Sequence, residues 1–577
     1  MRTINSIKLC LWLPVLLAVA GSCSYLDEDV KASSQKKSYY QTAEQIVSGL
    51  NGCYIPLRSI LTNPNYFVMT EGQTDIIYSP STGANATMEG VSPRNPQMGK
   101  TMWNNGYAGV MRCNAIIAAI DRSTLSDSKK APLYAEAEIL RSFYYYILTS
   151  GMGDVPYYTE EVTDENNARI THLGRMPASD TRNACIDALY DWLVVKRALP
   201  FAPTYSASNP DQYRAGAAVG LMLAGKMCLW EERWSDAIEI FGYLEDIYGN
   251  GAGHPEGSLS AYPLSDIPFY NKYVPESIFE LSNIQTDYGL NMYGALAASC
   301  EPIRSGSVVD EDEYYEDEDF TDLDDEKEDQ GSDQSDYYNG VGIPWLGGDA
   351  RTHAPLRPNT HFYQELMPAT APYNDKRRAA YNPYDGKEIA GGGGYMAWGW
   401  PGWDAADDRS KTPAHWLYFA GTKSVTGRPY LGNKFWCPSM QYNMDTNNYK
   451  IFRFAGVLLC LAEAWLRKGD ESKACDYLNE VKIRAGLQEV APGDFSDAEE
   501  LMEEIRNECA RELFGEFNRK FDLVRWGIWY DYVQKYSNSS RLKKFARPCH
   551  RYYPIPDQEI TYSGGNLDNN EYNLYGL

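Results

Sequence analysis

Residues 450–485 read KIFRFAGVLLCLAEAWLRKGDESKACDYLNEVKIRA, and this stretch decides the fold. On both sides of the turn at 468–470, the apolar residues have the spacing of an amphipathic helix. Ala462 and Ala474 lie twelve positions apart across that turn. Small side chains at this interval let two antiparallel helices approach closely, as in a tetratricopeptide hairpin. The stretch therefore predicts a helical hairpin with helices near 450–468 and 471–485.

A second hairpin of the same kind is predicted earlier in the chain, with helices near 212–231 and 235–248. Gly225 and Ala237 are also twelve positions apart, across the turn Glu232-Arg233-Trp234. Each unit spans roughly 35 residues, close to the 34-residue period of the tetratricopeptide repeat. Because such units expose an apolar face that only a neighbour can cover, we expect the helices before residue 250 and after residue 450 to form one body.

Further amphipathic stretches extend this body. Thr42, with Gln45 three residues later, is a predicted N-cap for a helix that runs to Leu61. The other stretches lie near 97–121, 135–148, 180–198, 497–515 and 519–536. We therefore predict a mainly α protein, with a discontinuous tetratricopeptide-like body at 41–249 and 450–577.

Between residues 250 and 449 the helical periodicity fails. Gly, Pro, Asn, Asp, Tyr and Trp dominate, and Gly391 to Gly394 are four consecutive glycines. About 200 residues without a regular period are unusual inside a compact domain and tend to be functional. We expect 250–449 to be an irregular, loop-rich lobe with a few short strands that binds the ligand.

The N-terminus has the pattern of an export signal. Arg2 and Lys8 precede a twelve-residue apolar run that is too short to span a bilayer and is interrupted by Pro14. Small residues follow and lead to Cys23, which predicts a lipoprotein signal peptide at 1–22 and lipidation of Cys23. The alternative is ordinary cleavage after 18–20. Residues 23–40 are polar and are predicted to be a tether.

The chain of 577 residues carries a formal charge of −25, which argues against a nucleic-acid partner because phosphate binding needs clustered Lys and Arg. Most of this charge comes from one insertion, 310–336, with sixteen carboxylates and one lysine. A solvated acidic insertion is the simpler interpretation. The alternative is a calcium ion held by Asp322, Asp324 and Glu326, although the run lacks the glycine of an EF-hand loop.

Catalytic motifs are missing from the sequence. It contains no HExxH, GxSxG or GxxxxGK[ST] motif, so zinc-peptidase, α/β-hydrolase and P-loop functions have no support. It has no CxxC, and five of its twelve cysteines fall in helical apolar patterns, which favours buried free thiols over disulfides. We therefore expect a binding protein and no enzyme, with no cofactor apart from the calcium alternative.

Several separated motifs resemble those of one known family. Residues 135–146 read AEAEILRSFYYY and are followed by GDVP at 153–156, which is similar to the AEARFLRAFYYF…FGDVP signature of the SusD/RagB family. The other resembling motifs are ESIFE at 276–280, DKR at 375–377, FRFAGVLLCLAEA at 452–464, the stretch 508–526 and YPIPDQEI at 553–560. In order and spacing these motifs cover nearly the whole chain after the signal peptide.

This resemblance implies a lipid-anchored protein on the outer-membrane surface of a bacterium. Members of the family cap a SusC-like TonB-dependent transporter and capture glycans for import, or peptides in RagB-like members. The acidic residues close behind Cys23 also resemble the surface-export signals of Bacteroidetes lipoproteins. A peptide or glycopeptide receptor therefore stays open beside the glycan receptor, as does a helical-repeat scaffold without a small ligand.

The aromatic residues of the predicted lobe are the candidate ligand contacts. A flat indole can stack on the apolar face of a sugar ring while nearby polar groups bind the hydroxyls. A small core beneath a long loop is the alternative for any single one of them. The candidates are Trp345, Tyr395, Trp398, Trp400, Trp403 and Trp416.

Overall fold

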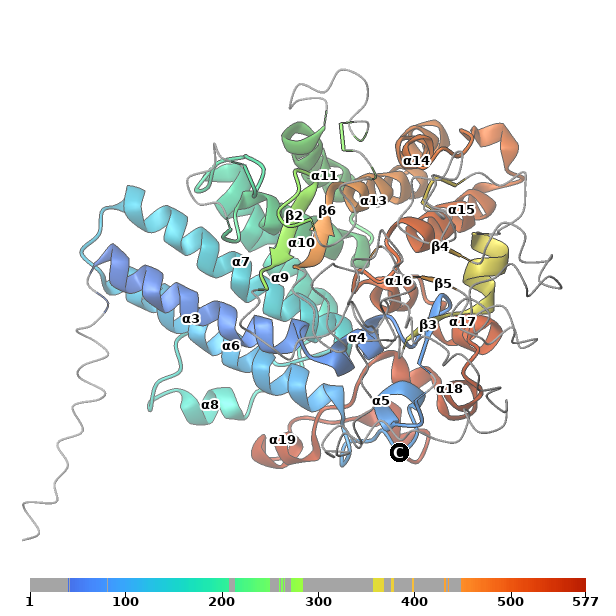
Figure 1. Cartoon of the computed structure of the whole chain (residues 1–577). Coiled ribbons are helices and arrows are strands. Elements are labelled where there is room, and N and C mark those ends of the chain that lie inside the picture. Colours follow the sequence, from blue (N-terminus) through green and yellow to red (C-terminus); the bar gives the residue numbers. More distant parts are fainter. Residues whose placement is uncertain are drawn as a thin grey trace, which may run out of the picture.

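The computed structural model describes residues 40, 42–79, 81–206, 213–249, 259, 261–262, 264, 271–283, 356–367, 375–377, 397–398, 430–431, 434 and 448–577. These residues are mostly helical, with short paired strands between the helices (Figure 1). This confirms the predicted mainly α class with its tetratricopeptide-like body. The helices used below are α3 (Ala43–Leu61), α4 (Pro64–Thr70), α5 (Ala84–Thr87), α6 (Met98–Arg122), α7 (Asp127–Met152), α9 (Ala178–Tyr190), α10 (Ala217–Trp230), α11 (Trp234–Tyr248), α13 (Phe454–Arg467), α14 (Glu471–Arg484), α15 (Ala498–Glu512), α16 (Arg519–Arg525), α17 (Trp529–Tyr536), α18 (Ser540–Phe545) and α19 (Asp557–Tyr562).

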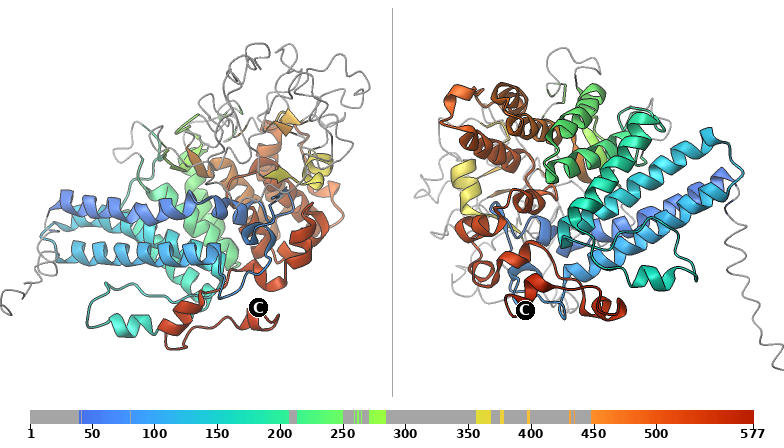
Figure 2. Two further views of the ribbon diagram at one scale, coloured as in Figure 1. Left: turned by 60° about the horizontal axis from the view of Figure 1, so that its bottom comes forward. Right: turned by 180° about the vertical axis from the view of Figure 1, so that it is seen from behind.

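Three long helices, α3, α6 and α7, run alongside one another at one end of the molecule (Figures 1 and 2). The predicted cap of α3 is confirmed, because Thr42 and Gln45 form a complete capping box. Helix α7 is the central helix, since all of its residues from Ala135 to Met152 are buried. It contacts α3, α6, α9 and α10, so it joins the long helices to the hairpins.

Both predicted hairpins are present, and α11 packs against α13 to join them. In the second hairpin, Gly469 takes a φ of +89° and Asp470 caps α14 by accepting a hydrogen bond from the backbone N–H of Lys473. In the first, the ring of Phe241 lies so close to Gly225 that a Cβ there would meet it at 2.5 Å. The close approach of α10 and α11 therefore requires a glycine at 225. The residue that Gly225 faces is Phe241, one turn after Ala237 on α11.

Several predicted helix boundaries are wrong. Helix α10 begins at Ala217, where a start near 212 was predicted, and α9 ends at Tyr190, where an end near 198 was predicted. Two further differences have a clear physical cause. Residues 450–453 form part of the strand β6 (Tyr449–Arg453), which pairs antiparallel with β2 (Ser277–Leu281), and the helix begins only at Phe454. The predicted helix 519–536 is divided into α16 and α17, because Gly527 adopts a φ of +76°, a conformation that interrupts a right-handed helix.

The cysteines of the described part carry free thiols, as predicted for those in helical patterns. Most of them are buried, and they contribute to the core as small apolar side chains. Within the same residues, the helices are too short or too polar to cross a membrane.

The contact between α6 and α7 gives a test of this packing. A Cβ at Gly109 would lie 2.1–2.4 Å from ring atoms of Tyr144. That ring cannot move aside, because its hydroxyl donates to the carbonyl of Cys53 and accepts from the N–H of Leu57 on α3. We expect Gly109→Ala to lower the free energy of unfolding by about 1–3 kcal/mol, as measured by chemical denaturation.

Gly52→Ala on α3 is the matched control, since a Cβ there meets nothing within 4 Å. Alanine should stabilise that half-buried helix position by up to about 1 kcal/mol. Equal effects of the two substitutions would contradict the packing described here.

Candidate functional site

The segment 284–447, which holds the predicted ligand residues, leaves the body and returns to it at neighbouring points. Strands β2 and β6 flank the segment, and their pairing sets Leu281 opposite Tyr449. Asn283 and Asn448, which lie between this strand pair and the segment in the sequence, are also joined. The N–H of Asn283 donates to Oδ1 of Asn448 at 2.9 Å. Asn448 in turn donates to Glu280 at 2.9 Å. The base of the segment is therefore closed by buried hydrogen bonds.

Residues 356–367 give a second attachment to the body. Strand β3 (Arg357–Pro358) pairs with β1 (Ile77–Tyr78), and Asn359 accepts from the N–H of Asn538 at 2.7 Å. The ring of Phe362 stacks on Phe514 with centroids 4.3 Å apart. This attachment combines strand pairing, hydrogen bonds and apolar burial.

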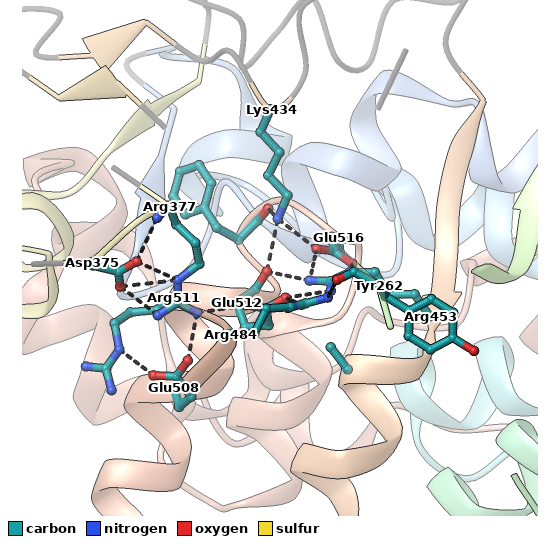
Figure 3. A network of polar contacts seen from close by, with 12 residues as sticks. Tyr262, Asp375, Arg377, Lys434, Arg453, Arg484, Glu508, Arg511, Glu512 and Glu516 are labelled. Atoms are coloured by element: carbon teal, nitrogen blue, oxygen red, sulfur yellow. Dashed lines mark hydrogen bonds and ion pairs between the residues drawn. The ribbon is translucent and has the colours of Figure 1, made fainter. Parts of the chain in front are cut away.

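The third attachment is a buried ion cluster on α15, shown in Figure 3. Arg377 is completely buried and contacts Asp375 at 2.7 Å, Glu508 at 2.7 Å and Glu512 at 2.8 Å. Its N–H groups thus bind one carboxylate of its own loop and two carboxylates one turn apart on α15. A buried arginine with so many partners is a strong, geometrically specific link.

Lys434 extends the cluster toward the turn that follows α15. Its ammonium donates to Glu516 at 2.7 Å and to the backbone carbonyls of Glu512 and Phe514 at 3.1 and 2.9 Å. Burial lowers the pKa of Lys434 to about 8, although the nearby carboxylate of Glu516 opposes this shift.

Arg453 and Arg484 complete the cluster from the body side. Arg453 contacts Glu276, Glu512 and Glu516 at 2.6–2.9 Å, and Arg484 contacts Glu276 at 2.8 Å and also Glu512. Burial alone would raise the pKa of Glu512, but these arginines and Arg377 hold it well below its usual range. We call the whole set the lobe-anchor cluster; its members are Glu276, Asp375, Arg377, Lys434, Arg453, Arg484, Glu508, Arg511, Glu512 and Glu516.

Models of known protein families match two parts of this sequence. A sequence model described as the SusD family matches residues 314–573, and one described as starch-binding associating with outer membrane matches residues 24–182. The two matches together take in most of the chain. The chain belongs to the SusD family.

Relatives of this SusD-family chain match it over nearly its whole length. A SusD-like protein of Formosa agariphila is 24% identical over 93% of this chain and 94% of its own. A SusD superfamily protein from Bacteroides vulgatus superposes with a TM-score of 0.61 at 18% identity, covering 92% and 99% of the two chains. Surface glycan-binding protein A from Bacteroides thetaiotaomicron in complex with laminarihexaose gives a TM-score of 0.60 at 20% identity, covering 91% and 98%. The two structural similarities establish a shared fold.

Four of the motifs by which the sequence resembled this family meet in the lobe-anchor cluster. Glu276 belongs to ESIFE, Arg377 to DKR and Arg453 to FRFAG, while Glu508 and Glu512 belong to the 508–526 stretch. Sequence reasoning found these motifs but missed that they are partners, because they are far apart in the chain. The feature of the sequence that could have indicated this cluster is the presence of charged residues inside motifs that are otherwise mostly apolar.

Most predicted site residues lie outside the described residues. This holds for Cys23, for the calcium candidates Asp322, Asp324 and Glu326, and for Trp345, Tyr395, Trp400, Trp403 and Trp416. The backbone of Trp398 is described: strand β4 (Ala397–Trp398) pairs antiparallel with β5 (Tyr430–Leu431), with Trp398 opposite Tyr430. Within the described ranges, no group of three His, Cys, Asp or Glu side chains is placed to hold a metal ion.

A second buried charge cluster joins the stretch after α4 to the start of α16. Asp75 pairs with Arg519 in the interior, and the adjacent Glu71 accepts hydrogen bonds from the N–H groups of Asn518 and Arg519 at 3.0 and 3.3 Å. The other carboxylate oxygen of Glu71 is buried and has no hydrogen-bond partner in the described part of the chain. Burial raises the pKa of Glu71 to about 8, although these hydrogen bonds and Arg519 oppose the shift.

Removing Arg377 tests the lobe-anchor cluster. Arg377→Met would leave Asp375, Glu508 and part of Glu512 as buried carboxylates without their shared cation. We expect a loss of about 3–5 kcal/mol in the free energy of unfolding, measured by chemical denaturation. Arg169→Met, which breaks an ion pair with Glu160 that is largely exposed, should change the free energy of unfolding far less. Similar losses in the two variants would refute a special role for the cluster.

Glu71 gives a pH-dependent prediction. Its folded pKa of about 8 lies above the unfolded value of 4.5, so folding takes up a proton between these pH values and the wild type loses stability as pH rises through the window. Glu71→Gln cannot lose a proton there. The stability of Glu71→Gln relative to wild type should therefore increase from pH 5 to pH 8, by up to about 1.4 kcal/mol per pH unit.

Denaturant titrations at pH 5, 7 and 9 measure this difference. Glu165→Gln, at an exposed glutamate, controls for the change in net charge. A constant difference between Glu71→Gln and wild type over this range would show that Glu71 is ionised at all three pH values.

Proposed function

We propose that this protein captures glycans at the surface of the outer membrane and delivers them to a SusC-like TonB-dependent transporter. The observation that carries the proposal is the membership in the SusD family across both the N-terminal helices and the C-terminal half. One matched family is described as starch-binding and associated with the outer membrane. The structure of a protein with the same fold is a complex with laminarihexaose. The expected role is binding and transfer, without catalysis.

The attachments of the 284–447 segment fit a binding role. A site that is held in place before the ligand arrives loses less conformational entropy on binding than a site that must first become ordered. Strand pairing at 356–367, the Arg377 contacts and the Lys434 contacts each hold a different part of this segment on the body. Loop residues between these points would thus be presented from a fixed base.

We place the ligand contacts in the aromatic cluster around β4 and β5. Tyr395 and Trp398 lie at or just before β4, while Trp400, Trp403 and Trp416 lie in the 399–429 stretch between the paired strands. Trp345 precedes this region in the sequence. Aromatic rings at such positions can stack on the apolar faces of sugar rings, with polar neighbours to bind the hydroxyls.

Membrane attachment in this proposal comes from Cys23. A diacylated or triacylated N-terminus anchors a protein to a membrane without a spanning helix, because each acyl chain contributes apolar burial. The polar residues 24–40 then separate the lipid from α3.

Alanine substitutions in the aromatic cluster test the proposal. Trp398→Ala and Trp403→Ala should abolish the retardation of the protein in affinity electrophoresis through polysaccharide gels, while the melting temperature stays close to that of the wild type. Trp192→Ala is the control, since Trp192 is a half-buried tryptophan of the helical body that stacks on Tyr134. Retention of glycan binding in both lobe variants, or binding of peptides in place of every glycan tested, would contradict the proposal.

A further inference from the structure

Three tyrosines form a compact aromatic group at the edge of the body, away from the lobe-anchor cluster. The ring centroids of Tyr205 and Tyr273 are 5.1 Å apart, those of Tyr213 and Tyr273 are 4.7 Å apart, and those of Tyr205 and Tyr213 are 6.1 Å apart. We call these residues the tyrosine triad. They lie in the stretch between the two matched family ranges, 24–182 and 314–573.

Two members of the triad are fixed to strand β2. The hydroxyl of Tyr205 accepts from the N–H of Glu280, and the hydroxyl of Tyr273 contacts Oγ of Ser282 at 2.6 Å. The N–H of Tyr273 also donates to the buried carboxylate of Glu280 at 2.9 Å. Because β2 is paired with β6, the two rings form a rigid support.

Tyr213 is the outer ring of the triad and is 56% exposed. It rests on the other two rings, and in the described part of the chain no hydrogen bond to its hydroxyl is formed. The outer face of Tyr213 is therefore a flat apolar surface that is held in place from behind and is open to a ligand.

Two of the three triad residues have a backbone conformation that is rare for tyrosine. Tyr213 has a φ of +74° and Tyr273 a φ of +55°, in the left-handed region where bulky side chains are rare and glycine is favoured. Such conformations persist where surrounding contacts hold them, as the hydrogen bonds to Glu280 and Ser282 do at Tyr273. At Tyr213 the left-handed conformation presents the ring to solvent, so burial of the ring does not offset the strain.

We propose that the tyrosine triad is a second saccharide-binding surface, on which a sugar ring stacks against Tyr213. This inference rests on the proposed glycan-binding function and adds a site separate from the aromatic cluster around β4 and β5. Tyrosine suits such a contact, because its ring covers an apolar sugar face and its hydroxyl can bond a sugar hydroxyl.

The geometry argues against a cationic ligand. Aromatic cages hold an ammonium group between rings, whereas the triad rings pack directly on one another at 4.7–6.1 Å. The neighbours in sequence, Arg214 and the exposed Lys272, are both basic. A neutral ligand that stacks on the outer face fits these surroundings better than a cation.

The triad also lies close to the start of the 284–447 segment. Ser282, which contacts Tyr273, is adjacent to Asn283, the last described residue before that segment. A long glycan chain held by the lobe would therefore have a second contact on the body, and two linked contacts bind a polymer more tightly than either one alone.

The test compares Tyr213→Ala, Tyr213→Phe and a control in affinity electrophoresis and in titration with the polysaccharide that retards the wild type most. The probes are a panel that includes laminarin and amylopectin. We expect Tyr213→Ala to weaken binding of the polymer about tenfold, whereas Tyr213→Phe, which keeps the ring, binds nearly as well as wild type. Tyr562→Ala on α19 is the matched control, because Tyr562 is also 56% exposed, and it should leave binding unchanged.

Tyr213→Gly separates a binding role from a structural one. Glycine relieves the positive φ, so this variant should melt at or above the wild-type temperature and still bind the polymer more weakly. A drop in melting temperature for Tyr213→Gly that accounts for the weaker binding would overturn the inference.

The remaining outcomes also decide the question. If Trp398→Ala and Trp403→Ala abolish glycan binding while Tyr213→Ala binds like wild type, the proposed function stands and the second surface is wrong. If no polysaccharide retards the wild type, both proposals fail. If Tyr213→Ala binds glycans normally but loses its association with a SusC-like transporter, the triad is a protein contact and the inference is overturned.

Discussion

Glu512 lies fully buried at the end of α15, where its carboxylate contacts Arg377, Arg453 and Arg484 (Figure 3). Arg377 comes from the irregular segment, Arg453 from the end of β6 and Arg484 from the end of α14. A buried carboxylate without partners would be strongly destabilising, so Glu512 is stabilised only when these parts of the chain come together around it. The packing of the body and the placement of the segment depend on each other through this group.

This constraint explains how a helical body can carry a long segment of irregular sequence. Helices satisfy their own backbone groups, but an irregular segment has few repeated hydrogen bonds and must be held by specific contacts. Here those contacts are charged and directional at Arg377 and Lys434, strand-like at β1–β3 and β2–β6, and apolar where Phe362 stacks on Phe514. Buried ion pairs add geometric specificity more reliably than net stability, which suits a segment whose position has to be defined.

The tyrosine triad is likewise held on the body by specific contacts. Its two inner tyrosines are bonded to Glu280 of β2, the strand that also closes the base of the irregular segment. A single two-stranded sheet thus fixes both the exit of the proposed ligand-binding segment and the support of the proposed second surface. Glycan contacts in the two places would be held by one rigid element, with little cost in ordering them.

The sequence by itself determined the helical class, both hairpins and the capping box at Thr42, because the signals for these features lie within a few residues of one another. It was wrong where a local signal was overridden or missed: residues 450–453 pair with β2, and Gly527 divides α16 from α17. Only the tertiary structure decided that the charged residues of four distant motifs are partners, and that Tyr205, Tyr213 and Tyr273 meet. Arg484 and Glu276 are 208 positions apart in the chain, and Tyr205 and Tyr273 are also far apart. Periodicity along the chain carries no information about which distant side chains will share a buried charge or stack their rings.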